Sequence, residues 1–438
     1  MASRTLSRRF HRLRDRLSTP WVRAILYVML IPLFPEYLAP VLAILSFVAA
    51  AREAHKTHRP IVIGAVGKVL LCFITYFALT TPFAELPGAS LSSLALWMLM
   101  FLSYLSLTTV ITDRGRLEDT LYMVSLVAGL VGLIGCVQYF LRFVGYPVNL
   151  QFWEPVDRFV YSFFPFNINL DVTGTRVSST FSNPNILGQY LVMITPFVAH
   201  YAFHGQVTHR RTLCRFCLLA CIGCAAFTLS RGTYLALFMI ALVLIIANIR
   251  NIVTISLSLL SALLLVPETV WTRLSSIGRL DASTLERLNV WQLCIGLFTK
   301  EPLFGYGCGV QYTWSVMLAN RIPAPHAHNV VLQLLVEGGI VGLCLMLFLG
   351  FRVVQSGFAL TSRKENRHLG AAILAFAVGF CTNGMVEYGF TFPKVIGAFA
   401  LVLAITDTAC CFQLNRKLSP LAETVTFARW RQGATVKK

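Results

Sequence analysis

The chain contains a series of apolar runs, each long enough to cross a lipid bilayer as a helix. They recur from about residue 20 to residue 412 of the 438 residues, and a helix needs about 20 apolar residues for one crossing. The composition agrees, because 56% of the residues are hydrophobic and 13% are charged, whereas soluble domains carry about 25% charged residues. The sequence therefore predicts an all-α, polytopic membrane protein.

We expect about twelve membrane-spanning helices. The predicted spans are residues 20–36, 37–52, 60–80, 91–111, 119–141, 184–204, 214–229, 232–249, 251–267, 329–350, 368–390 and 393–412. Residues 20–52 form either one very long helix or two short helices joined at the turn Pro35-Glu36-Tyr37. Two helices fit the positive-inside rule, because the segments that then face the cytoplasm hold 26 of the 37 Lys and Arg residues. Both termini are then cytoplasmic.

Polar tails and two long polar loops complete a single integral membrane domain, 1–438. We predict cytoplasmic tails at 1–19 and 413–438, a first periplasmic loop at 142–183 and a large periplasmic loop at 268–328. The net charge of +18 indicates contact with anionic lipid head groups rather than nucleic acid, because most basic residues lie in the cytoplasmic segments. The 12 cysteines lie mostly in apolar spans, so no disulfide or zinc framework is predicted.

Nine of the remaining basic residues gather at the opposite, outer face of the predicted bundle. They are Arg158, Arg176, Arg231, Arg273, Arg279, Arg287, Lys300, Arg321 and Lys394. Long loops tolerate such charges, so those in the loops need no special function. Arg231 differs, because it lies between two apolar runs in FTLSRGTYLAL. Its side chain either extends to the interface, or clamps a phosphate or diphosphate at the outer leaflet, which is the reading we favour.

A Ser- and Asn-rich segment, TFSNPN, leads into the sixth predicted span. Ser182 or Asn183 is expected to cap this helix, with Pro184 as its first residue. The free amides of the helix start, together with Arg176, Asn183 and Asn185, could form an anion or sugar site. Simple capping by these polar side chains is the alternative.

The large loop contains a predicted amphipathic helix from Ser283 to about Lys300. Pro302 and the glycines at 305, 307 and 309 then end it. No strand precedes these glycines, so they predict a tight turn and not a dinucleotide site.

His326 and His328 close this loop at the start of the tenth predicted span. Imidazole titrates nearest to neutral pH, so His328 could accept a proton from a hydroxyl group. The alternative is that one histidine caps the helix and the other binds loop backbone. Glu337 lies further along the same helix beside Gly338, Gly339 and Gly342, so this segment predicts either a functional carboxylate or a bend in the helix.

These residues resemble a known family. The pattern His328-Asn329, nine residues, Gly339, two residues and Gly342 resembles the signature of O-antigen ligases and related O-antigen polymerases. Three further blocks are similar: Arg176 with TFSNPN, SRG at 230–232, and Arg287-x-x-x-Trp291 followed by PLFGYG at 302–307. The resemblance covers a core of about 170–350. Leu343 stands where ligases usually carry Gly, Thr or Tyr, which keeps the polymerase as an alternative.

The resemblance implies a metal-independent, inverting glycosyltransferase of the GT-C type in the bacterial inner membrane, with no cofactor. Its donor would be a glycan on undecaprenyl diphosphate, and its acceptor a sugar hydroxyl of lipid A core or of another glycan. It also implies roles: His328 as catalytic base, and Arg231 and Arg287 as the clamp on the leaving diphosphate. The predicted substrate-binding residues are Arg176, Asn183, Asn185, His326 and Arg279.

A solute transporter is the rival from another class, since some members of this superfamily have been labelled bicarbonate carriers. A transporter should place charges near the bilayer midplane in broken helices. Here Lys68 and Glu337 are the arguable midspan charges, and the others crowd at one face, so the sequence favours the enzyme.

Overall fold

The computed structural model describes residues 19–144, 176–247, 282–414 and 418–425. Among these residues the regular secondary structure is helical, except for one antiparallel pair of two-residue strands. Seven of the described helices are long and apolar enough to cross a membrane, and two shorter ones are also apolar. The prediction of an all-α, polytopic membrane protein is confirmed.

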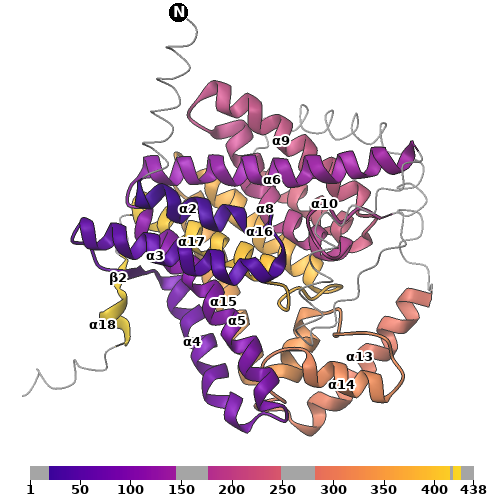
Figure 1. The fold of residues 1–438 in the computed structure, drawn as a ribbon. Coiled ribbons are helices and arrows are strands. Elements are labelled where there is room, and N and C mark those ends of the chain that lie inside the picture. The colour runs from indigo at the N-terminus through magenta and orange to yellow at the C-terminus, as the bar shows by residue number, and fades with distance from the viewer. Residues whose placement is uncertain (1–18, 145–175, 248–281, 415–417, 426–438) are drawn as a thin grey trace, which may run out of the picture.

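Eleven of the twelve predicted spans coincide with a described helix (Figure 1). These helices are α2 (Pro20–Leu30), α3 (Ala39–Lys56), α4 (Ala65–Thr80), α5 (Pro87–Val110), α6 (Arg114–Phe143), α8 (Pro184–His204), α9 (Thr208–Phe227), α10 (Arg231–Ala247), α15 (Val330–Thr361), α16 (Arg367–Gly384) and α17 (Pro393–Leu414). The predicted span 251–267 lies outside the described residues. Since seven helices qualify by length and composition, the count of twelve stays a prediction.

Residues 20–52 form two helices, α2 and α3. The short 3-10 helix η1 (Glu36–Leu38) separates them. Helix α2 ends just before Pro32, which lacks the N–H that would continue it. At the other end of the chain, α16 ends at Gly384 rather than at residue 390. Glu387 therefore lies in the connection between α16 and α17.

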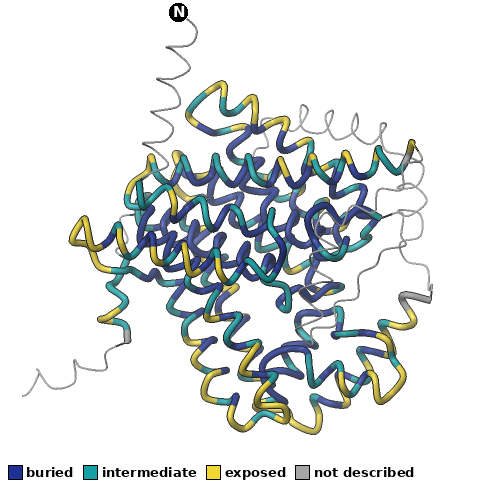
Figure 2. Tube along the Cα trace, in the orientation of Figure 1, coloured by how far each residue is buried: buried dark blue, intermediate teal, exposed yellow. Residues whose placement is uncertain are grey.

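Two helices form the centre of the bundle. In both α8 and α17, 89% of the apolar window is buried inside the protein. Figure 2 shows the buried residues gathered in the middle of the molecule and the exposed residues at its periphery. The start of α8 is thus a fixed point against which neighbouring helices pack, which matters because several site residues lie there.

The described segment before α15, residues 282–329, packs against the tip of the α4–α5 hairpin. It contains α13 (Ala282–Lys300) and α14 (Gln311–Ala319), which lie beside the lower ends of α4 and α5 in Figure 1. The Glu85 amide donates to the Tyr306 carbonyl at 3.2 Å, and the Ser93 hydroxyl lies 3.2 Å from the Gln311 side-chain oxygen. The predicted helix from Ser283 to Lys300 and the turn at glycines 305–309, all three with positive φ, are confirmed.

Helix α15 is broken at Gly339. Its φ of 60° and ψ of −161° lie in a region that is accessible essentially to glycine alone. The turn after α13 hydrogen-bonds to the broken helix, because the Tyr306 and Gly307 amides donate to the carbonyls of Val336 and Glu337 at 2.9 Å. The Glu337 carboxylate accepts from the Gly309 amide at 2.9 Å. The bent-helix reading of this segment is confirmed, and Glu337 serves the packing of the turn.

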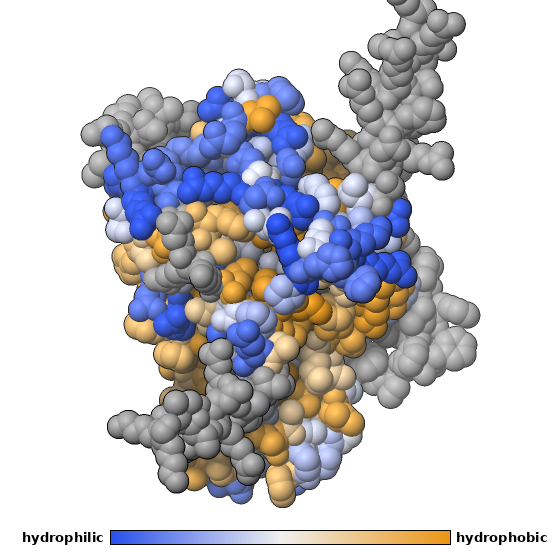
Figure 3. Space-filling model, turned by 90° about the vertical axis from the view of Figure 1, so that its left-hand side faces the viewer, coloured by the Kyte–Doolittle hydropathy of each residue, from blue (hydrophilic) through white to orange (hydrophobic). Residues whose placement is uncertain are grey.

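A polar face lies at the side of the molecule that carries the strand pair. Strands β1 (Val62–Ile63) and β2 (Ser419–Pro420) pair antiparallel, and the short helix α18 (Leu421–Val425) follows. Figure 3 looks onto this side and shows hydrophilic side chains across its upper part, with hydrophobic side chains below. Lys56 and Arg59, at the end of α3, are exposed.

Candidate functional site

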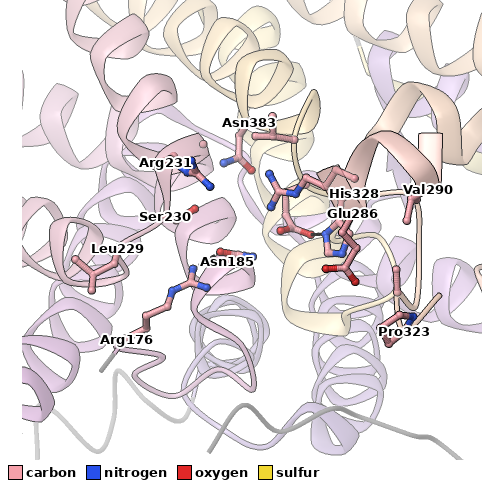
Figure 4. A pocket seen from close by; sticks show the side chains of 15 residues that line it. Arg176, Asn185, Leu229, Ser230, Arg231, Glu286, Val290, Pro323, His328 and Asn383 are labelled. Atoms are coloured by element: carbon pink, nitrogen blue, oxygen red, sulfur yellow. Dashed lines mark hydrogen bonds and ion pairs between the residues drawn. The ribbon is translucent and has the colours of Figure 1, made fainter. Parts of the chain in front are cut away.

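A polar cleft lies between the starts of α8 and α10 on one side and α13 and the start of α15 on the other (Figure 4). Its volume is about 800 Å³, including the part that opens to solvent. Its lining residues are Arg176, Asn185, Leu229, Ser230, Arg231, Gly232, Glu286, Arg287, Val290, Pro323, Ala324, His328, Asn383, Val386 and Glu387. Three arginines, one histidine and two carboxylates thus face a common space.

The start of α8 supplies the first wall of the cleft. Asn183 caps the helix, since its side chain accepts from the Asn185 amide at 2.7 Å, and Pro184 is the first helical residue. The Arg176 guanidinium donates from Nε to the Thr228 carbonyl at 2.8 Å and also donates to the Asn185 side-chain oxygen. These bonds fix the direction of Arg176 and leave its charge at the edge of the cleft.

Arg231 is the first residue of α10, directly after a sharp turn. Leu229 has a φ of 50° in this turn, a left-handed conformation that costs a non-glycine residue about 1–2 kcal/mol. Gly232 packs against the neighbouring connection so closely that an added Cβ would lie 2.4 Å from Val386. The guanidinium and the first amides of α10 therefore meet at one wall of the cleft, an arrangement that favours anions.

The opposite wall carries His328, whose φ of 47° is also left-handed. Hydrogen bonds fix both backbone groups of the preceding residue, Ala327. Its amide donates to Gln333 at 2.9 Å, and its carbonyl accepts from the Trp291 indole at 3.0 Å. Asn329 caps α15 by accepting from the Leu332 amide at 3.0 Å. Backbone strain at His328 is thus maintained by surrounding hydrogen bonds, which is common at functional sites.

Glu387 orients both histidines from the connection after α16. Its Oε1 lies 3.2 Å from His328 Nδ1 and 3.7 Å from His326 Nε2, and it also accepts from the Tyr388 amide at 3.1 Å. Because Nδ1 of His328 faces a carboxylate, that nitrogen carries the proton. The lone pair of the neutral ring is therefore on Nε2, the nitrogen that can accept a proton from a substrate.

The charge states of this cluster follow from burial and from the neighbouring groups. Burial raises the pKa of the Glu387 carboxyl, but the His328 ring, His326 and the Tyr388 amide outweigh it and lower that pKa to about 2. Burial, followed by repulsion from His328 and Arg287, lowers the pKa of the His326 ring to about 3. At neutral pH Glu387 is therefore ionised and His326 is neutral.

His326, His328 and Glu387 are close enough to be considered as metal ligands. The hydrogen bonds argue against it. The His328 amide donates to Nδ1 of His326 at 3.2 Å, so the proton of the neutral His326 ring is on Nε2. That nitrogen faces Glu387, and a protonated nitrogen offers no lone pair to a metal ion. The arrangement is that of a hydrogen-bonded cluster.

The structure brings five of the predicted site residues to the cleft: Arg176, Asn185, Arg231, Arg287 and His328. Asn183 and His326 do not line it, because Asn183 caps α8 and His326 lies buried behind His328. Arg279 lies outside the described residues.

The sequence did not predict the other cleft residues as site residues, and Glu387 and Asn383 are among them. The Glu387 carboxylate contacts the two histidines. Lys394 is buried, donates to the Thr180 carbonyl and lies over the Phe181 ring. A carboxylate at the end of an apolar run was the available signal, yet its partner is 59 residues away in the sequence.

Comparison with known proteins matches the centre of the chain to one family. Residues 216–347 match the O-antigen ligase family model. The predicted resemblance is confirmed. The chain is also similar to the Rickettsia conorii protein named "Putative polysaccharide ligase", with 28% identity over 115 residues. This match covers 24% of the chain and 27% of the length of the Rickettsia protein.

The O-antigen ligase match supplies part of the cleft. It contains Arg231, Arg287 and His328. Arg176 and Asn185 come from before the matched segment, and Asn383 and Glu387 come from after it. The cleft therefore joins the O-antigen ligase segment to the rest of the bundle.

Proposed function

We propose that this protein is a glycosyltransferase of the O-antigen ligase type. It would transfer a glycan from undecaprenyl diphosphate to a sugar hydroxyl of lipid A core at the periplasmic face of the bacterial inner membrane, with both termini cytoplasmic. One observation carries the proposal: a cleft in which three arginines face a histidine whose tautomer is fixed by a buried carboxylate.

The arginines fit the diphosphate of such a donor. Arg176, Arg231 and Arg287 line one cleft, and planar guanidinium groups bind phosphate oxygens through paired, charge-assisted hydrogen bonds. A diphosphate becomes a good leaving group when its developing charge is neutralised. Fixed cations at the cleft can provide this neutralisation, so we propose a reaction that needs no metal ion.

His328 fits the role of general base. Its Nδ1 is bound to Glu387, which leaves Nε2 free to take the proton of the acceptor hydroxyl. The ionised Glu387 also stabilises the positive charge that the ring gains on accepting this proton. His326, hydrogen-bonded behind the pair, would be a positioning residue.

The reaction balances without another reactant. The acceptor oxygen forms a bond to the anomeric carbon as its proton passes to His328, and the bond from that carbon to the diphosphate oxygen breaks. The electron pair leaves with the diphosphate, held by the arginines. Attack opposite to the leaving group inverts the anomeric configuration.

The related polymerase is the alternative, because it would use the same donor and differ in its acceptor, a growing lipid-linked glycan. Leu343, at the position where ligases usually carry Gly, Thr or Tyr, favours this alternative. The acceptor must therefore be decided by experiment.

Purified protein in detergent should transfer glycan from undecaprenyl-diphosphate-linked oligosaccharide in the presence of a metal chelator. The reaction is run with and without lipid A core, and the products are separated on a gel. Transfer onto core supports the ligase, and a ladder of lengthened donor supports the polymerase. His328→Ala should abolish transfer while the protein remains folded. Absence of transfer by folded wild-type protein with every donor would refute the proposal and favour the transporter.

A further inference from the structure

Asn383 carries a buried polar atom that the cleft leaves without a partner. The residue is 1% exposed, and no hydrogen bond reaches its Oδ1. Among the described residues that line the cleft, Asn383 is the one with a buried side-chain polar atom that makes no hydrogen bond. A buried polar atom without a hydrogen bond costs about 1–3 kcal/mol, so its presence at a cleft indicates that a ligand satisfies it.

Asn383 lies between Arg231, one member of the proposed phosphate clamp, and the proposed base. On one side, an added Cβ at Gly232, next to Arg231, would lie 3.6 Å from Asn383 Nδ2. On the other side, Asn329, next to His328, donates from Nδ2 to the carbonyl of Met385 at 3.0 Å. Figure 4 shows the same order, with Asn383 between Arg231 and His328.

The order of groups in the proposed reaction identifies what would lie there. The anomeric carbon must stand between the leaving diphosphate and the attacking hydroxyl, so the donor's first sugar fills the space between Arg231 and His328. A carbonyl oxygen such as Oδ1 needs a hydrogen-bond donor. The ionised diphosphate has none, whereas a sugar carries hydroxyl groups and in some cases an amide N–H.

We propose that Asn383 Oδ1 accepts a hydrogen bond from a hydroxyl or amide N–H of the sugar that is attached directly to the diphosphate. Asn383 is thus a specificity residue for the donor's first sugar. This inference rests on the proposed function. It has a consequence for selectivity, because a site built to bind a substrate donor group rejects an analogue that lacks it more strongly than an apolar site can.

The test compares two probes on detergent-purified, full-length protein. One probe is undecaprenyl diphosphate, and the other is undecaprenyl diphosphate carrying a single hexose or N-acetylhexosamine. We expect Asn383→Leu to weaken binding of the sugar-bearing probe by about tenfold, as for the loss of one hydrogen bond. Binding of the bare diphosphate should change by less than about twofold. An equal loss for both probes, or a loss for neither, would overturn the inference.

The control is Gln189→Leu. Gln189 is also a buried amide without hydrogen-bond partners among the described residues, but it does not line the cleft. This variant should bind both probes like the wild type. The melting temperature of Asn383→Leu should equal or exceed that of the wild type, because the substitution removes an unsatisfied buried group. A large decrease would indicate a structural role.

A second measurement uses the wild-type protein alone and so does not depend on a folded variant. A series of probes, each lacking one hydroxyl or amide of the sugar, is tested for binding. One of them should lose about as much affinity as Asn383→Leu does with the complete sugar. If every analogue binds like the complete sugar, the inference is wrong while the proposed function stands. If the wild type binds no polyprenyl diphosphate at all, that result refutes the proposed function itself.

Discussion

Replacing Glu387 by glutamine tests whether this carboxylate sets the tautomer and charge of the base. The change keeps the shape of the side chain but removes its negative charge, which lies 3.2 Å from His328 Nδ1. Glutamine can still accept from one histidine, but its NH₂ group cannot accept, and its neutral oxygen stabilises an imidazolium ring less than a carboxylate does. The transition state, in which the ring gains a proton, should therefore lose more stabilisation than the ground state.

The size of the effect follows from the distance and the burial. Two full charges 3.2 Å apart attract by about 5 kcal/mol at an effective dielectric constant near 20, which is a gross value. The net contribution of a hydrogen bond to a charged group is about 1.5–3 kcal/mol. Since about 1.4 kcal/mol corresponds to a factor of ten in rate, kcat should fall by about 10- to 150-fold.

The assay is glycan transfer at saturating donor and acceptor, with KM for the donor measured in parallel. We expect KM to change by less than about threefold, because the Glu387 carboxylate contacts the two histidines. Glu301→Gln is the matched control. It makes the same chemical change outside the cleft, since Glu301 is an exposed residue directly after α13. A Glu387→Gln enzyme with wild-type kcat would refute the proposed tautomer and charge control.

Three further predictions concern the clamp, the break in α15 and the acid sensitivity of the cluster. Arg231→Lys keeps the charge but loses the paired geometry, so donor affinity should fall at least about tenfold; unchanged affinity would mean that Arg231 merely extends to the interface. Gly339→Ala should strongly lower the melting temperature in detergent, because the new Cβ would lie 2.3 Å from the Leu303 carbonyl oxygen at a φ of 60°, whereas Gly350→Ala, in open space on the same helix, should not. The pKa of Glu387 is lowered to about 2, so its ionised form stabilises the fold above about pH 4.3 and this stabilisation is lost toward pH 2. The difference in melting temperature between wild type and Glu387→Gln should narrow over that range, and a constant difference would contradict the assignment.

The sequence predicted the helices well where one local pattern decides the structure. Pro184 and Asn183 predicted the start of α8, and the apolar pattern ending at Pro302 predicted α13. In both cases residues within one or two turns carry the signal. The end of α16 was predicted too late, because apolar residues continue past Gly384 although the helix does not.

The site was predictable only in part, because its halves are joined by tertiary contacts. Arg231 and His328 stood out at the edge of apolar runs, and the family resemblance gave Arg287 its role. Glu387 also lies at the end of an apolar run, but a carboxylate or an amide after a helix is common, so the sequence did not assign Glu387 or Asn383 to the site. Only the packing of the connection after α16 against the start of α15 shows that Glu387 faces His328.

The break at Gly339 gives the turn at 302–309 two anchors on α15. The amides of Tyr306, Gly307 and Gly309 donate to the half of α15 that follows His328. The amide of Ile340, the first residue of the other half, donates to the Pro302 carbonyl at 2.9 Å. A movement of either half would therefore pull on this turn and on α13 before it, so that the proposed base and Arg287, which α13 carries, should move together.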